Sequence, residues 1–211
     1  TVITKNENYK ELVNKVENKE LNEEINLPKN LNASLRSYQK VGYKWLKVLD
    51  NYGFGGILAD DMGLGKTIQL LAVILDYVQN EKNPKPSIVV CPSSLSLNWQ
   101  NEIKKFTPDL TSLVIHGNAD ERVKQIKSIP KYNIVITSYD LLKRDIEIYK
   151  ELNYEFKFII ADEAQYIKNS NTQNAKSLKA ISAETKFALT GTPIENSLAE
   201  LWSIFDLIMP G

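Results

Sequence analysis

Residues 60–67 place two glycines directly before a lysine and a threonine. This run separates an apolar segment from a segment with helical spacing. Gly63 and Gly65 let main-chain N–H groups approach a phosphate closely, and a helix N-terminus behind them attracts negative charge. Lys66 supplies a point charge for β- and γ-phosphates, and Thr67 offers a hydroxyl to Mg²⁺. The strict phosphate-loop pattern has glycine where this chain has Asp60. The context nevertheless predicts a nucleotide-binding loop.

A second acidic motif follows another apolar run. Asp162 and Glu163 come immediately after residues 158–161, where two unpaired carboxylates would be costly unless they faced a cation or water. A phosphate-loop enzyme needs one acid to hold Mg²⁺ and a second to orient the attacking water. Asp162 is predicted to take the first role and Glu163 the second. Lys66, Asp162 and Glu163 are therefore the predicted catalytic residues.

The elements that must position these motifs alternate regularly from residue 34 onward. Ser34 is predicted to cap a helix, and later segments with helical spacing cover residues 68–78, 95–106 and 141–149. Between them lie short β-branched-rich runs at residues 56–59, 88–91, 113–115, 134–137, 158–161 and 187–190. Such runs are typical of strands buried on both faces. The pattern predicts a doubly wound α/β parallel sheet with helices on both faces, whose ligands lie at the carboxyl ends of the strands.

Bulk properties narrow the class of protein further. Residues 1–33 read as a short helical extension and polar linker, and residues 34–211 as the main domain. The chain has 26 basic and 26 acidic residues, so any contact with nucleic acid should be local. No apolar run approaches the ~20 residues of a membrane-spanning helix. The single cysteine, Cys91, cannot form an internal disulfide, which suits an intracellular protein.

Seven motifs in order resemble the SWI/SNF branch of helicase-like superfamily two, over about residues 34–211. The segments are 35–42, 57–69, 90–102, 136–140, 162–169, 189–196 and 200–202, and in this family the aspartate at position 60 is usual. The resemblance implies a RecA-like ATP-binding lobe that uses ATP and Mg²⁺. A second lobe of the same polypeptide, which supplies arginines to the site, is absent from this chain. The resemblance also implies that double-stranded DNA is a partner and that the protein is located in the cytoplasm or nucleoid of a prokaryote, or in a nucleus.

The resemblance also assigns roles to individual positions. It gives nucleotide binding to Gln39, Asp60, Gly63, Leu64, Gly65, Lys66 and Thr67, and metal binding to Thr67 and Asp162. It gives DNA contact to Ser93, Ser94, Thr137, Ser138, Lys168 and Asn169, and the coupling of nucleotide state to DNA grip to Gln165, Thr190 and Thr192. Family members usually have histidine at position 165, where this chain has a glutamine that can still bridge by hydrogen bonding.

Three functions remain open from the sequence. The first is a DNA-stimulated ATPase that translocates on duplex DNA and remodels protein–DNA complexes. The second is a strand-separating helicase on RNA or single-stranded DNA, which would favour a row of stacking aromatic residues. Trp99 and Trp202 are instead predicted to be core residues. The third is a nucleotide-gated binding module, against which the retention of both acids argues.

Overall fold

The computed structural model describes residues 26–59, 65–167, 172–191 and 198–208, and side chains only from Trp202 in the last segment. The described residues contain one sheet of six strands. All its strand pairs are parallel, in the order β1-β6-β5-β2-β4-β3. The strands are β1 (Gly56–Leu58), β2 (Ser87–Cys91), β3 (Ser112–Val114), β4 (Ile134–Ser138), β5 (Glu155–Ala161) and β6 (Ser182–Leu189). The predicted parallel α/β sheet is confirmed, and the predicted helix before Ser34 lies outside the described residues.

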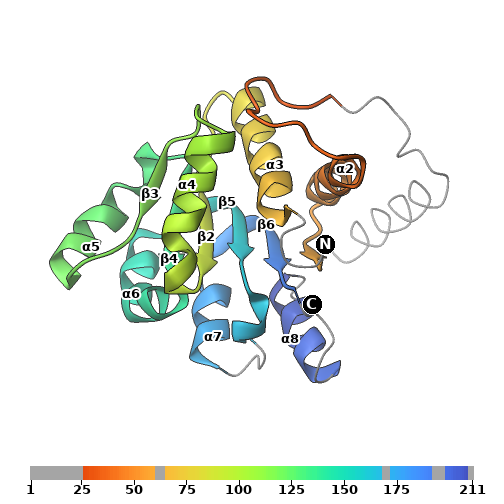
Figure 1. Cartoon of the computed structure of the whole chain (residues 1–211). Coiled ribbons are helices and arrows are strands. Elements are labelled where there is room, and N and C mark those ends of the chain that lie inside the picture. The colour runs from red at the N-terminus through yellow and green to blue at the C-terminus, as the bar shows by residue number, and fades with distance from the viewer. Residues whose placement is uncertain (1–25, 60–64, 168–171, 192–197, 209–211) are drawn as a thin grey trace.

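Seven α-helices in the described residues cover the two faces of this sheet (Figure 1). They are α2 (Ser37–Asn51), α3 (Lys66–Asn80), α4 (Ser96–Phe106), α5 (Ala119–Lys127), α6 (Tyr139–Leu152), α7 (Gln173–Lys179) and α8 (Leu198–Ile208). Side chains of α2, α3 and α4 form one core and those of α5 to α8 form the other. Alternate residues of one strand enter opposite cores: Val89 joins the first and Val90 the second. This double burial explains why the strands read as continuous apolar runs.

Helix α2 begins later than the sequence predicts. Its N-cap is Arg36 rather than Ser34, and the side-chain oxygen of Gln39 accepts the main-chain N–H of Arg36 at 2.8 Å. Gln39, the third residue of the helix, thus satisfies the main-chain N–H of the N-cap residue, as in a capping box. Gly42 then brings α2 close to α3, because a Cβ there would lie 1.8 Å from the side-chain oxygen of Gln69.

Helix α8 corrects a second prediction. Trp202 is 72% exposed and Phe205, one turn later, is 38% exposed, so Trp202 is not a core residue. Trp99 in contrast is 1% exposed and lies in the core as predicted. Both tryptophans occur in helical segments, so local spacing could not tell them apart. The strand and helix packed against each segment made the difference.

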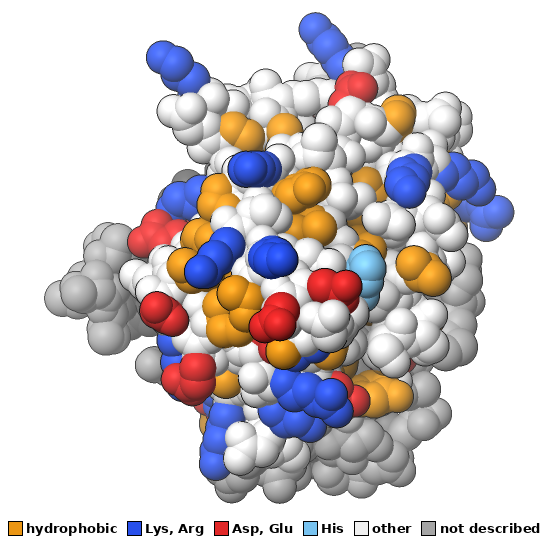
Figure 2. Space-filling view, turned by 90° about the vertical axis from the view of Figure 1, so that its left-hand side faces the viewer, with side chains coloured by type: hydrophobic (Ala, Val, Ile, Leu, Met, Phe, Trp, Pro, Cys, Tyr) orange, Lys and Arg blue, Asp and Glu red, His pale blue; other side chains and the backbone are white. Residues whose placement is uncertain are grey.

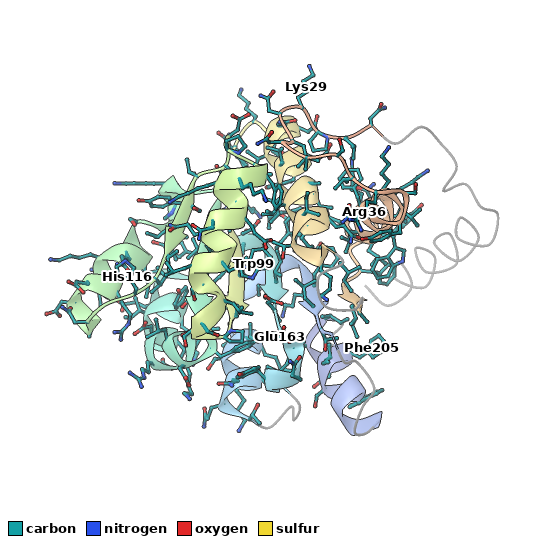
Figure 3. The ribbon with its side chains drawn as sticks, in the orientation of Figure 1. Lys29, Arg36, Trp99, His116, Glu163 and Phe205 are labelled. Carbon is teal, nitrogen blue, oxygen red and sulfur yellow. The ribbon has the colours of Figure 1, made fainter. Side chains whose placement is uncertain are left out.

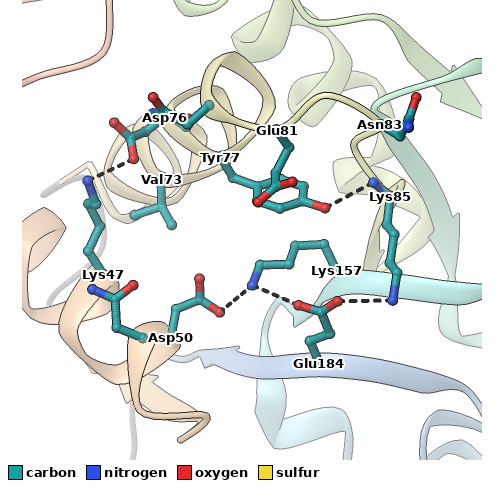
Figure 4. A pocket seen from close by; sticks show the side chains of 12 residues that line it. Lys47, Asp50, Val73, Asp76, Tyr77, Glu81, Asn83, Lys85, Lys157 and Glu184 are labelled. Atoms are coloured by element: carbon teal, nitrogen blue, oxygen red, sulfur yellow. Dashed lines mark hydrogen bonds and ion pairs between the residues drawn. The ribbon is translucent and has the colours of Figure 1, made fainter.

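Ion pairs fill the amino edge of the sheet, opposite the predicted site. A pocket of about 410 Å³ there is lined by α2, α3 and the first residues of β5 and β6 (Figure 4). The Nζ of Lys157 lies 2.9 Å from a carboxylate oxygen of Asp50 on α2 and 2.9 Å from one of Glu184 on β6. The Nζ of Lys47 lies 2.7 Å from a carboxylate oxygen of Asp76. These polar positions explain why β5 and β6 extend further toward the amino end than the apolar runs predict. The pairs join α2 to α3 and to the sheet.

Charges of both signs are interspersed on the side of the molecule shown in Figure 2, with hydrophobic side chains between them. This mixture agrees with the zero formal net charge of the chain. None of the helices in the described segments combines the length and apolar character that crossing a membrane requires.

A buried ion pair joins α5 to α6. The Nε and one terminal nitrogen of Arg122 donate to the two carboxylate oxygens of Asp145 at 2.7 and 2.8 Å, and the other terminal nitrogen donates to the carbonyl of Gly117 at 2.9 Å. Arg122 is 9% and Asp145 5% exposed. The pairing raises the pKa of Arg122 above its ordinary value, chiefly through the hydrogen bonds to Asp145.

We predict that Asp145→Ala lowers the free energy of unfolding by about 3–5 kcal/mol, because it leaves a buried guanidinium without its partner. The double variant Arg122→Met/Asp145→Leu should recover most of this loss. Glu147→Ala, on the same helix in the exposed pair with Lys150 at 2.8 Å, is the matched control and should change stability little. Urea unfolding followed by circular dichroism measures all three. Equal losses for Asp145→Ala and Glu147→Ala would contradict the prediction.

Candidate functional site

The predicted motifs meet at the carboxyl edge of the sheet. Because every strand pair is parallel, the segments after β1, β2, β4, β5 and β6 all emerge at this edge. Asp162 follows β5, and Thr190 follows β6 and donates its main-chain N–H to the carbonyl of Leu58 at the end of β1. Segments separated by more than a hundred residues therefore share one site.

The start of α3 brings the nucleotide-side residues together. Gly65 has a φ of 77°, which favours glycine, and Lys66 is the first residue of the helix. A Cβ on Gly65 would lie 2.4 Å from the side-chain nitrogen of Gln39, so only glycine allows this contact. Lys66 and Thr67 are half-buried at the helix N-terminus, where main-chain N–H groups favour an anion. The structure thus places Gln39 beside the end of the predicted loop.

Asp162 is held at four atoms. Its main-chain N–H donates to the carbonyl of Val90 at 2.8 Å, and its own carbonyl accepts the hydroxyl of Tyr139 at 2.7 Å. One carboxylate oxygen accepts the main-chain N–H of Glu163 at 2.9 Å, and the other accepts the indole N–H of Trp99 at 2.8 Å. Trp99 and Glu163 are labelled in Figure 3. The carboxylate plane is therefore set by two donors from two different elements.

Burial raises the pKa of the Asp162 carboxyl above its ordinary value, and the charge of Glu163 acts in the same direction. The hydrogen bonds from Trp99 and from the main chain of Glu163 oppose this shift, and so does the positive charge of Lys66. Lys66 begins α3, which follows β1, and Asp162 follows β5, so the parallel sheet places both residues at the carboxyl edge. Burial likewise raises the pKa of Tyr139, which keeps its hydroxyl protonated as a donor to Asp162.

Glu163 begins a chain of side chains that reaches β6. Its φ is 50°, a conformation that non-glycine residues rarely adopt and that is concentrated at functional sites. The side-chain nitrogen of Gln165 donates to the Glu163 carboxylate, and the hydroxyl of Thr190 donates to the side-chain oxygen of Gln165 at 3.3 Å. Glutamine at position 165 thus joins the predicted water-orienting acid to the predicted coupling threonine.

The residues predicted to contact DNA divide into two groups. Ser93 and Ser94 are exposed in the short 3-10 helix η2 (Ser93–Leu95), which follows β2. Thr137 is 1% and Ser138 5% exposed, and the Ser138 hydroxyl accepts the main-chain N–H of Leu141 as the cap of α6. Both side chains are therefore buried, and their role in contacting DNA stays a prediction.

Six of the predicted site residues lie outside the described residues. They are Asp60, Gly63, Leu64, Lys168, Asn169 and Thr192, and their roles stay predictions. No group of three histidine, cysteine, aspartate or glutamate side chains within the described segments could hold a metal by itself.

Sequence reasoning missed the two residues that hold Asp162 from the helices. Trp99 is predicted only to be a core residue, and Tyr139 is only one member of the predicted motif at residues 136–140. Each nevertheless donates a hydrogen bond to Asp162. A signal was available, because the N–H of a buried tryptophan and the O–H of a buried tyrosine usually require an acceptor. The sequence alone could not identify which acceptor they find.

The three arginines of the chain lie in different elements. Arg36 precedes α2, Arg122 is committed to Asp145, and Arg144 is exposed on α6. Arg122 thus serves the scaffold, and Lys66 is a cation that the described residues place at the carboxyl edge.

Comparison with known proteins agrees with this geometry. The chain is 44% identical over 184 residues to an uncharacterised ATP-dependent helicase of Mycoplasma genitalium, covering 87% of this chain and 18% of that protein. It is 38% identical to human TATA-binding protein-associated factor 172, covering 88% of this chain and 11% of that protein. It thus spans under a fifth of the length of these relatives.

A solved structure is similar as well. The Sulfolobus solfataricus SWI2/SNF2 ATPase core in complex with double-stranded DNA superposes with a TM-score of 0.79 at 43% identity, over 89% of this chain and 38% of that one. The family model described as the SNF2-related domain matches residues 38–211, which include every segment that forms the carboxyl-edge site. With a RecA-like sheet, a matching ATPase core and this family match, the chain belongs to the SNF2-related domain family.

Proposed function

We propose that this chain is the ATP-binding lobe of a DNA-stimulated ATPase that translocates on double-stranded DNA and remodels protein–DNA complexes. The observation that carries the proposal is the convergence of Lys66, Asp162, Glu163 and Gln165 at one edge of the sheet. The relatives support it, since they include an ATP-dependent helicase and an ATPase core solved with duplex DNA.

ATP would bind at the start of α3 and against the side chain of Gln39. Lys66 would pair with the β- and γ-phosphates, and the helix N-terminus would add its dipole. Thr67 and Asp162 offer the oxygen ligands that Mg²⁺ prefers, and among the described residues each carboxylate oxygen of Asp162 accepts one hydrogen bond. When bound, the ion would neutralise charge that develops on the phosphates. The donor set therefore fits Mg²⁺ bound together with ATP.

Hydrolysis would depend on Glu163. The carboxylate stands beside the proposed metal ligand and is bound by Gln165, which keeps it oriented. In this position it would orient the attacking water. Gln165 also accepts from Thr190 at the end of β6. A displacement of the segment after β6 would thus reach Glu163 through one side chain, which is a physical route for coupling to DNA grip.

Duplex DNA would run across the carboxyl edge near Ser93 and Ser94, which are exposed. Contacts from Lys168 and Asn169, which lie outside the described residues, stay predictions. Contacts to phosphates dominate such sequence-independent binding. A second lobe of the same polypeptide would supply the arginines that complete the site, since Arg122 is committed to Asp145, Arg36 precedes α2 and Arg144 lies on α6. Arginines that reach the γ-phosphate contribute ~10³–10⁵ in rate in phosphate-loop enzymes.

We predict that Lys66→Ala abolishes measurable ATP binding and leaves the fold intact, because the lysine stands at the helix N-terminus and not in either core. Titration with a fluorescent ATP analogue measures binding, and circular dichroism reports the fold. Lys124→Ala, an exposed lysine on α5, is the control and should bind as the unmodified chain does. A folded Lys66→Ala variant with undiminished affinity would refute the assignment.

We predict that Glu163→Gln keeps Mg²⁺-dependent ATP binding and lowers the hydrolysis rate by about 10²–10⁴ in the polypeptide that carries both lobes. Glutamine can still accept the hydrogen bond from Gln165, so the geometry survives and only the charged acceptor for the water is lost. Single-turnover hydrolysis separates this step from binding. Turnover near that of the unmodified enzyme would mean that another group orients the water.

The kind of nucleic acid that stimulates the enzyme is tested by the ATPase rate of the two-lobe polypeptide with duplex DNA, single-stranded DNA, RNA or no addition. We expect strong stimulation by duplex DNA alone, and little DNA stimulation of residues 1–211 in isolation. Stimulation by RNA or single strands would favour a strand-separating helicase. No stimulation by any nucleic acid, with ATP binding intact, would favour a nucleotide-gated binding module.

A further inference from the structure

Trp99 is a core residue with a polar task. It lies on the first turn of α4, is 1% exposed, and donates its indole N–H to the carboxylate of Asp162 at 2.8 Å. An indole has one donor and no acceptor, so this bond occupies its whole capacity for hydrogen bonding. The ring packs into the core shared by α2, α3 and α4. Packing therefore fixes the ring, and the fixed ring aims its N–H at one oxygen.

Two donors of different origin hold the Asp162 carboxylate. The main-chain N–H of Glu163 binds the first oxygen at 2.9 Å, and Trp99 binds the second. A carboxylate held at both oxygens cannot rotate freely about its last torsion. A bond to an ionised acceptor is also stronger than one between neutral groups. Without Trp99, a single bond would be left to set the direction in which the free lone pairs point.

We propose that Trp99 is a positioning residue for Asp162, and that its indole N–H orients this carboxylate for Mg²⁺ bound with ATP. The proposal rests on the proposed function, because it requires Asp162 to be a metal ligand. Partners that orient a metal ligand in this way are commonly worth 10- to 100-fold in metal affinity.

The position of Trp99 also joins the metal ligand to the exposed segment predicted to meet DNA. Helix α4 begins at Ser96, directly after the 3-10 helix η2 that carries Ser93 and Ser94. The sulfur of Cys91, at the end of β2, lies 3.7 Å from the Ser96 hydroxyl and ties the start of α4 to the sheet. A movement of this helix start would therefore shift the donor of the Asp162 bond.

The first test is Trp99→Phe, which keeps an aromatic ring in the core and deletes the N–H. A fluorescent ATP analogue is bound to the chain and titrated with Mg²⁺. We expect the Mg²⁺ concentration at half-maximal binding to rise about 10-fold or more, with metal-free nucleotide affinity unchanged. Ile103→Val is the matched control, since it removes one buried methylene from the same helix. It should lower stability and leave the Mg²⁺ dependence unaltered.

A double-mutant cycle separates positioning from packing. If Trp99 acts through Asp162, then adding Trp99→Phe to Asp162→Ala should cause no further loss of Mg²⁺ affinity. Equal Mg²⁺ dependence of folded Trp99→Phe and the unmodified chain, while Asp162→Ala loses affinity, would overturn the proposal and leave the proposed function standing. No effect of Asp162→Ala would overturn the metal assignment itself, and the role of Trp99 with it.

A measurement on the unmodified chain covers the case in which Trp99→Phe fails to fold. The chain has three tryptophans, so a ¹H–¹⁵N spectrum contains three indole signals. We expect the Trp99 signal to move when Mg²⁺ is added to the ATP-bound chain, and to move again in Asp162→Ala. The Trp202 signal, from an exposed ring, should stay in place. A Trp99 signal that shifts neither on addition of Mg²⁺ nor in Asp162→Ala would contradict the proposal.

Discussion

In a parallel sheet that is covered on both faces, charged and polar side chains can reach solvent or a ligand only at the ends of the strands. Between these ends, the strand residues enter one of two cores, as Val89 and Val90 do in succession. Charged groups would be costly there, because burial disfavours an unpaired charge. The chemistry of this domain is therefore divided between two edges. The carboxyl edge holds the nucleotide-side residues, and the amino edge holds a set of ion pairs around Lys157.

The two edges are connected through α2. The last turn of this helix places Asp50 against Lys157 at the amino edge, while its first turn places Gln39 beside Gly65 at the carboxyl edge. Gly42 allows the close contact with α3 between these points. The pairs at the amino edge thus help to set the position of a residue proposed to bind the nucleotide.

Asp162 is the point at which most elements of the site meet. Strand β2, helix α4, helix α6 and the turn after β5 each supply one hydrogen-bond partner to this residue. Glu163, next to it, is linked through Gln165 to Thr190 after β6. Burial of the Asp162 carboxyl would by itself favour the neutral form, and the surrounding donors and Lys66 oppose that effect. A half-buried carboxylate of this kind is suited to a cation that arrives with a ligand.

The order of strands and helices was determined by the sequence itself, since runs buried on both faces and amphipathic segments alternate from residue 34 to the end. The same local signals identified Lys66, Asp162 and Glu163, because glycine spacing and strand ends are properties of neighbouring residues. The partners of those residues depended on contacts across the fold. Trp99 and Trp202 are both predicted to be core residues, but only Trp99 is buried by the elements packed around it. Thr137 and Ser138 belong to a predicted DNA-side motif, and the tertiary structure buries both side chains, with the Ser138 hydroxyl capping α6. Local periodicity reports which face of an element is apolar, whereas burial and hydrogen-bond partners depend on which other element covers that face. Only the tertiary structure decides this.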